Sequence, residues 1–342
     1  MSPATLQQSR ERQGLLLCLL AAAGFGSMGV MAKLSYEAGA SVLTLLSVRF
    51  ARGAALLWAI AAHRGVARIT RPRAAAAALT MGLLLYSAES GIYAAALTRI
   101  DASLAELLIF TYPALVVVAA IALRREPPSR RRVGAVAIAT GGVLLVLLGG
   151  AIGAVDPLGV GLALAAAVLY AAYVLSTHGI GARLHPLTFA ALVCTGAAIS
   201  FTVFGAAAGE LRPAEVAAEG WLWIALIAVL STAVGMTAFI AGVERLGPSR
   251  ASIMSALDPF VAVIAAALVF GDRLGPVQLL GGLLIVAAVV VLQVPGVRAL
   301  RLRSRARVDL PDAVGSPERD PSARPAPQPS AGSLALVTSE RR

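Results

Sequence analysis

Two stretches of this sequence decide its fold: ALTRIDASLAELLIFTYPALVVVAAIALRRE (96–126) and GVERLGPSRASIMSALDPFVAVIAAALVFGD (242–272). A constant offset, 259 − 113 = 146, aligns Pro113 with Pro259 and Arg99 with Arg245 without a gap. Both stretches carry a long apolar run with a proline inside it. The chain therefore repeats itself, and each copy contains a segment long enough to cross a membrane.

The rest of the chain is equally apolar. Of its 342 residues, 58% are hydrophobic and 14% charged, against about 25% charged in soluble domains. The apolar runs are continuous rather than alternating, which indicates helices and not barrel strands. We predict an all-α integral membrane protein with ten transmembrane helices, over residues 14–33, 41–62, 74–97, 103–123, 133–150, 157–177, 186–208, 220–243, 250–270 and 275–294.

The repeat divides these helices into two sets of five, residues 14–150 and 157–294. An odd number of helices in each copy forces opposite orientations, so the sequence predicts two inverted five-helix repeats. Inverted repeats give a protein two similar packings, open to either side, around a site near the middle of the membrane. This architecture favours a transporter over a receptor or an enzyme.

The basic residues predict the orientation. Nearly all arginines in the links fall on the side that holds residues 1–13 and the tail, whereas the opposite links hold Arg99, Arg212 and Arg273. Cytoplasmic loops are the basic ones, so we expect both termini in the cytoplasm. The net charge of +11 then reflects membrane orientation and not a nucleic-acid partner. Residues 298–342, rich in Pro, Ser and Arg, indicate a disordered cytoplasmic tail.

The segment 10–23 also resembles a secretory signal peptide, with two arginines before GLLLCLLAAA. We favour an uncleaved first helix, because the apolar run continues to Lys33.

The run YAAALTRIDASLAELLIFTYPALVVVAAIALRRE (93–126), with Gly141 and Gly142 after it, resembles the C-terminal half of an EamA-type domain. The segments FGSMGVMAKL (25–34) and LSVRFARGAALL (46–57) are similar to its first two helices, and 242–274 looks like a second copy. That domain belongs to the drug/metabolite transporter superfamily. The resemblance implies ten helices, cytoplasmic termini and movement of small metabolites, often outward. Abundant Ala, Gly and Arg suggest a bacterial origin, and hence the inner membrane.

A charge in the bilayer centre costs about 2.5–3.5 kcal/mol even on the mildest scale, so such residues mark candidate sites. Six ionisable residues lie within or beside the predicted spans: Lys33, Arg49, Arg52, Glu89, Glu106 and Asp258. Glu89 stands out because Tyr86 and Tyr93 share its helix face. It is a candidate for binding an ammonium group or carrying a proton. The competing interpretation is a fixed ion pair of Glu89 with Arg49.

Further candidates complete the predicted site. Arg49 could hold a carboxylate or phosphate, and Glu106 could meet it and Glu89 in one cavity. Tyr170 and Tyr173 share a face of the sixth span and are expected to line that cavity, with an interfacial aromatic belt as the rival for Tyr170. Pro113 and Pro259 are candidate helix breaks. Asp258 either caps the second break or carries a proton.

We therefore expect a secondary-active exporter of small amphipathic or zwitterionic metabolites such as amino acids, working by alternating access, with proton coupling as an option. Alternatives are a nucleotide-sugar or lipid-headgroup carrier of the same fold, or a receptor or scaffold acting through its tail. The scattered histidines form no metal or catalytic pattern, no ATP-binding loop is present, and no cofactor is expected. The expected partners are a small-molecule substrate, the lipid bilayer and protons; the sequence leaves a homodimer open.

Overall fold

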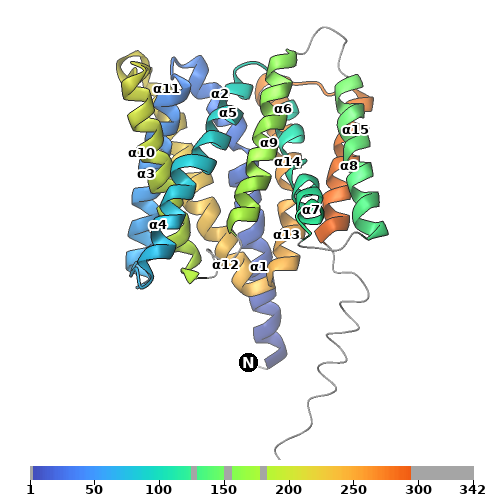
Figure 1. Cartoon of the computed structure of the whole chain (residues 1–342), viewed down its shortest axis with the longest axis horizontal. Helices are drawn as coiled ribbons and strands as arrows, with labels where there is room; N and C mark the ends of the chain where they lie inside the picture. The colour runs from blue at the N-terminus through green and yellow to red at the C-terminus, as the bar shows by residue number, and fades with distance from the viewer. Residues whose placement is uncertain (1–2, 125–128, 150–155, 178–182, 294–342) are drawn as a thin grey trace, which may run out of the picture. The chain divides into compact units, whose positions relative to one another are not determined.

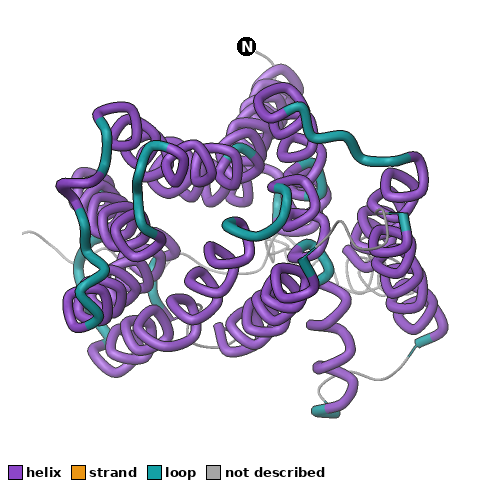
Figure 2. The backbone as a smooth tube through the Cα atoms, turned by 90° about the horizontal axis from the view of Figure 1, so that it is seen from above, coloured by secondary structure: helices purple, strands orange, loops and turns teal. Residues whose placement is uncertain are grey.

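The computed structural model of the chain describes residues 3–124, 129–149, 156–177 and 183–293. Every regular element in these ranges is a helix, and they contain no strand (Figure 2). The elements are α1 (Pro3–Gly26), α2 (Met28–Glu37), α3 (Val42–His63), α4 (Pro72–Met81), η1 (Gly82–Tyr86), α5 (Ser87–Leu97), α6 (Ala102–Ile109), α7 (Tyr112–Ala122), α8 (Arg130–Leu148), α9 (Pro157–Thr177), α10 (Pro186–Ala207), η3 (Pro213–Glu215), α11 (Ala218–Leu226), η4 (Ile227–Gly235), α12 (Met236–Leu246), α13 (Pro248–Ser255), α14 (Asp258–Phe270) and α15 (Pro276–Gln293).

These elements form ten membrane passages, each made of one helix or of consecutive helices that cross the bundle once. Eight helical stretches of the described chain are long and apolar enough to cross a membrane, and the shorter apolar helices α14 and α15 belong to the last two passages. The prediction of an all-helical membrane protein with ten transmembrane helices is confirmed. The first helix differs most from its expected span of 14–33, because α1 begins at Pro3 and α2 continues to Glu37. The predicted tail, 298–342, lies outside the described residues.

The offset of 146 residues recurs in the helix boundaries. It relates the starts of α4 and α11 (Pro72, Ala218), of α6 and α13 (Ala102, Pro248), of α7 and α14 (Tyr112, Asp258), and of α8 and α15 (Arg130, Pro276). The π-helical turn η1 falls on residues 228–232 after the same shift, inside the π-helical turn η4. The predicted pair of inverted five-helix repeats is thus confirmed, and even the irregular turns are repeated.

Two spans that we expected to be continuous are interrupted next to a proline. The span predicted over 103–123 divides into α6 and α7 at Phe110 and Thr111, and that over 250–270 divides into α13 and α14. Proline lacks an amide hydrogen and its ring clashes with the carbonyl four residues earlier. Four residues before Pro113 and Pro259 are Ile109 and Ser255, the last residues of α6 and α13. The two breaks follow from this clash.

Neighbouring helices pack through glycines where the backbones approach closely. The helices α3 and α10 run side by side, as do α8 and α15 (Figure 1). The helix α10 also crosses the turn η1, where a Cβ atom on Gly196 would lie 2.2 Å from the carbonyl oxygen of Leu79. A Cβ atom on Gly82 would likewise lie 2.1 Å from the carbonyl oxygen of Val193. Only glycine fits at either position of this crossing.

One end of the bundle, the upper end in Figure 1, is tied together by polar contacts between helices. Lys33 Nζ lies 3.9 Å from Asp101 Oδ1, and Ser103 Oγ donates a hydrogen bond to Asp272 Oδ2 at 3.0 Å. Arg99 donates to Asp156 Oδ2 at 2.9 Å, a hydrogen bond that lowers the pKa of this carboxyl below its usual value. These contacts join the starts of α6 and α9 to the ends of α2, α5 and α14.

The glycine crossing makes a prediction about stability. Replacing Gly196 by Ala should destabilise the protein by about 1–3 kcal/mol, because the new methyl group meets backbone that cannot move away. Gly161→Ala in α9 is the matched control, since a Cβ there has nothing within 4 Å; it should be neutral or stabilising by up to about 1 kcal/mol. Thermal unfolding of both variants in detergent tests this, and equal melting temperatures would contradict it.

Candidate functional site

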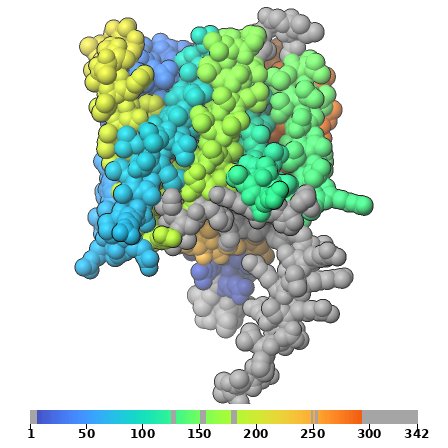
Figure 3. Space-filling view, in the orientation of Figure 1, coloured from blue at the N-terminus to red at the C-terminus, as the bar shows by residue number. Residues whose placement is uncertain are grey.

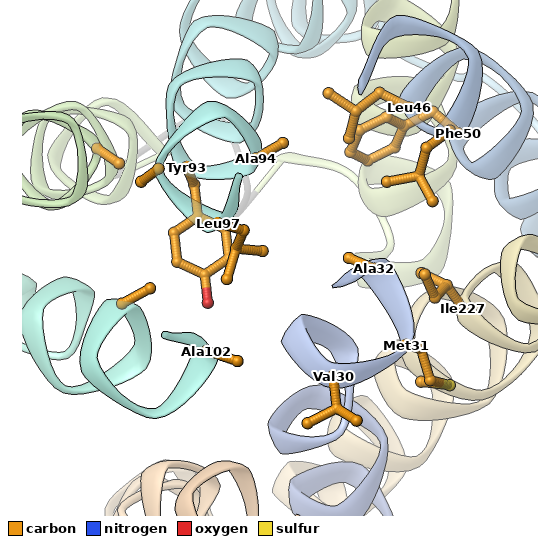
Figure 4. Close-up of a cluster of buried hydrophobic side chains, with 14 of the residues drawn as sticks. Val30, Met31, Ala32, Leu46, Phe50, Tyr93, Ala94, Leu97, Ala102 and Ile227 are labelled. Atoms are coloured by element: carbon orange, nitrogen blue, oxygen red, sulfur yellow. The ribbon is translucent and has the colours of Figure 1, made fainter. Parts of the chain in front are cut away.

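A cavity of about 600 Å³ lies inside the bundle. Its lining comes from eight of the ten passages; α8 and α15 contribute no described residue to it. All six tyrosines of the sequence line it: Tyr36, Tyr86, Tyr93, Tyr112, Tyr170 and Tyr173. Figure 4 shows part of its surroundings, with the Tyr93 hydroxyl of α5 directed toward the helix that carries Ala102, α6. The cavity is mostly apolar and concave, as small-molecule sites are.

Eight of the side chains predicted from the sequence as candidates reach this one cavity, whereas Lys33 and Arg52 are not in its described lining. Its lining includes Arg49, Tyr86, Glu89, Tyr93, Glu106, Tyr170, Tyr173 and Asp258. Pro113 and Pro259 are not part of the lining, but each follows a residue that is, Tyr112 and Asp258. The three acids and the one arginine are the ionisable groups that the structure brings together.

Glu89 and Arg49 do not form the ion pair considered as an alternative. Within the described ranges, Arg49 has no carboxylate at ion-pairing distance; its Nε donates to Thr232 Oγ1 at 3.4 Å, and its guanidinium lies 4.7 Å from the centre of the Phe50 ring. Glu89 instead accepts a hydrogen bond from Ser90 Oγ at 2.9 Å. Both side chains are buried. Each of the two side chains therefore contacts neutral groups and not the other charge, and both line the same cavity.

Tyr93 has a different partner from the one its position suggests. Its hydroxyl donates to Glu106 Oε2 at 2.8 Å rather than to Glu89. The short connection between α5 and α6 turns the chain back, so that α6 packs against the end of α5 and brings Glu106 beside Tyr93. Tyr93 thus hydrogen-bonds the second acid, Glu106, and not Glu89.

Asp258 does not cap its helix. It is the first residue of α14, whose N-cap is Leu257 and has no side-chain capping bond. Its Oδ1 atom is buried, and no hydrogen-bond partner for it occurs in the described part of the chain. The repeat partner of Asp258 is Tyr112, the first residue of α7, which lines the same cavity. Sequence reasoning missed Tyr112, although the offset of 146 residues pointed to it.

Aromatic rings form a continuous series along one wall of the cavity. Tyr86 and Tyr173 have ring centres 5.1 Å apart, Tyr173 stacks on Tyr170 at 5.9 Å, and Tyr170 meets Tyr112 edge-on at 4.5 Å. Figure 3 shows α9, which carries Tyr170 and Tyr173, between α5 and α7. Such rings offer apolar contact and attract cations over their faces.

The described lining of the cavity differs in burial between its two ends. Near the upper end Leu97, Tyr93 and Glu106 are buried, and Tyr36 is partly exposed. Toward the lower end Phe239 and Thr177 are partly exposed, and Pro186 at the start of α10 is exposed. The more buried end is the one joined by the contacts of Lys33 and Ser103.

Comparison with known proteins gives related transporters. The chain is 26% identical over 296 residues to an uncharacterized transporter, YcbK, of Bacillus subtilis (strain 168), covering 80% of this chain and 92% of that protein. It is 30% identical over 149 residues to the threonine/homoserine exporter RhtA of Escherichia coli (strain K12), covering 42% of this chain and 48% of the exporter.

A solved structure titled only "Crystal structure of protein" superposes with a TM-score of 0.58 at 20% identity, covering 86% of this chain and 98% of that one, which supports the fold alone. The model of the EamA-like transporter family matches twice, at residues 12–148 and 157–294. Because these two matches take up most of the sequence, the chain belongs to the EamA-like transporter family.

Proposed function

We propose that this transporter exports a small zwitterionic or amphipathic metabolite, such as an amino acid, by alternating access. The observation that carries the proposal is the single cavity in which Arg49 and Glu89 are both buried without being paired to each other. A buried ion that lacks a counter-ion is costly. A zwitterion supplies both missing charges, its carboxylate to Arg49 and its ammonium group to Glu89. The match with this chain covers 48% of RhtA, which is named a threonine/homoserine exporter.

Glu89 is also our candidate for proton coupling. A carboxyl that binds an ammonium group in one state and a proton in the other gives both cations the same site, so only one can occupy it at a time. Competition of this kind couples outward movement of substrate to inward movement of protons. The hydrogen bond from Ser90 keeps one oxygen of Glu89 in place and leaves the other for the exchanging cation.

We interpret the more buried end of the cavity as closed and the more exposed end as open, an arrangement that fits a transport cycle. With both termini in the bacterial cytoplasm, as proposed, the upper end faces outward and the structure is the inward-open state. The contacts Lys33–Asp101 and Ser103–Asp272 then form the outer gate. The inverted repeats allow a second packing in which this gate opens and the lower end closes.

The charges disfavour a carrier of phosphate-bearing substrates such as nucleotide sugars or lipid headgroups. Arg49 is the one cation that the described lining contains, against Glu89, Glu106 and Asp258. A phosphate would meet three carboxyls and one arginine, whereas an amine meets favourable partners on most sides. The scaffold alternative depends on the tail, which lies outside the described residues.

Export can be tested by untargeted mass spectrometry of the growth medium from cells that express wild type or Glu89→Gln at equal membrane levels. Wild type should release a solute with an ammonium group, and the variant should lose at least about tenfold of that release, because it loses a charge-assisted contact. Glu215→Gln, at an exposed carboxyl outside the cavity and away from the gate contacts, is the matched control for expression and insertion. Equal amounts of every solute in the media of cells with wild type and with Glu89→Gln would contradict the proposal.

Orientation can be tested with cysteines and a membrane-impermeant thiol reagent. Thr177→Cys should react from the cytoplasmic side, because Thr177 lines the accessible end of the cavity, whereas Ser103→Cys should resist labelling from outside, because Ser103 is buried in the closed end. The native cysteines Cys18 and Cys194 are buried and give little background. Labelling of Thr177→Cys only from outside would reverse the proposed topology.

A further inference from the structure

We infer that Glu106 and Asp258 form a second cation subsite, so that the preferred substrate is an amino acid with a positively charged side chain. The inference rests on the proposed function, in which Arg49 and Glu89 hold the carboxylate and the ammonium group of the α-carbon. It adds a separate position for the side-chain cation of the same molecule.

The charge balance of the cavity is the first argument. Arg49 and Glu89 cancel, which leaves Glu106 and Asp258 without a protein cation among the residues that line the cavity. Glu106 and Asp258 line the same cavity, and two carboxylates in one apolar cavity repel each other when both are ionised. A neutral amino acid leaves that repulsion in place. A side-chain ammonium or guanidinium group between the two carboxyls removes it.

The hydrogen bonding around Asp258 is the second argument. Its Oδ1 atom is buried and has no partner within the described chain. Buried polar atoms without partners are rare, and each calls for a missing partner. Glu106 accepts one hydrogen bond, from Tyr93, and a carboxyl can accept several more. The two groups thus have unused acceptors for the three donors of an ammonium group.

The aromatic surroundings are the third argument. Tyr112, the repeat partner of Asp258, lines the same cavity and meets Tyr170 edge-on at 4.5 Å. Tyrosine faces attract cations and also cover the aliphatic part of a basic side chain. At equivalent positions, the first repeat therefore supplies the ring of Tyr112 and the second repeat the carboxyl of Asp258. A ring and a carboxyl together suit a long side chain that ends in a cation.

Counterflow into proteoliposomes with purified wild-type protein tests this subsite. The probes are radiolabelled L-lysine and L-norleucine, which share their chain and differ in the side-chain amine. Wild type should carry lysine in preference to norleucine by about tenfold or more, the gain expected of a charge-assisted contact. Asp258→Asn and Glu106→Gln should each lower that ratio about tenfold. Asp258→Glu should largely keep it, and Glu215→Gln, at an exposed carboxyl outside the cavity, should leave it unchanged.

The outcomes separate this inference from the proposed function. Equal transport of lysine and norleucine, or an unchanged ratio in Asp258→Asn, would overturn the subsite and leave amino-acid transport standing. An unchanged ratio combined with loss of proton dependence in Asp258→Asn would assign Asp258 to the proton and also overturn the subsite. Failure of wild type to carry lysine would overturn the subsite, whereas the growth-medium experiment decides the proposed function. Only a fall in the ratio confined to the two cavity variants supports the subsite.

Discussion

Backbone amide and carbonyl groups find no water in the hydrocarbon core, and this constraint explains where the chain allows its helices to break. Unpaired backbone groups at membrane depth are tolerated only inside protein or beside a cavity. The interruptions before Tyr112 and Asp258 both satisfy that condition, because each of these residues lines the central cavity. The cavity and the breaks therefore depend on each other: the prolines force the breaks, and the surrounding helices keep them away from lipid.

The inverted repeat relates the two breaks to each other, but the residues at the two breaks are chemically different. Pro113 and Pro259 are the same residue at equivalent positions, so both repeats share the backbone irregularity. The residues just before them, Tyr112 and Asp258, are not the same. In a transport cycle the two repeats would exchange their packings. The backbone geometry of the protein would then be the same in both states, but the Asp258 carboxyl and the Tyr112 phenol would have exchanged their surroundings. Such a cycle can be symmetric in shape and still bind its substrate differently in its two states.

The sequence was sufficient for the fold and for the charged side chains of the cavity. Charges and tyrosines within apolar runs are rare enough that Glu89, Glu106, Asp258 and Arg49 stood out one by one, and the constant spacing of Pro113 and Pro259 implied the inverted repeat. Contacts between helices were harder to foresee. Helix faces alone placed Tyr93 with Glu89, whereas the turn between α5 and α6 gives it to Glu106. The π-helical turns η1 and η4 also lack a sequence signal, since no proline marks them.

The absence of a Glu89–Arg49 ion pair bears on how such a cavity can transport at all. A buried pair with ideal geometry would neutralise itself and leave little binding energy for a solute. Here Arg49 lies against Phe50 and Thr232, and Glu89 against Ser90, so each charge is held by neutral groups that satisfy it only in part. A zwitterion can replace these weak contacts with two strong ones. When it leaves, Arg49 and Glu89 return to their neutral partners, which stabilise the two charges only in part. Under the proposed function, this incomplete satisfaction is what lets the substrate bind and also leave.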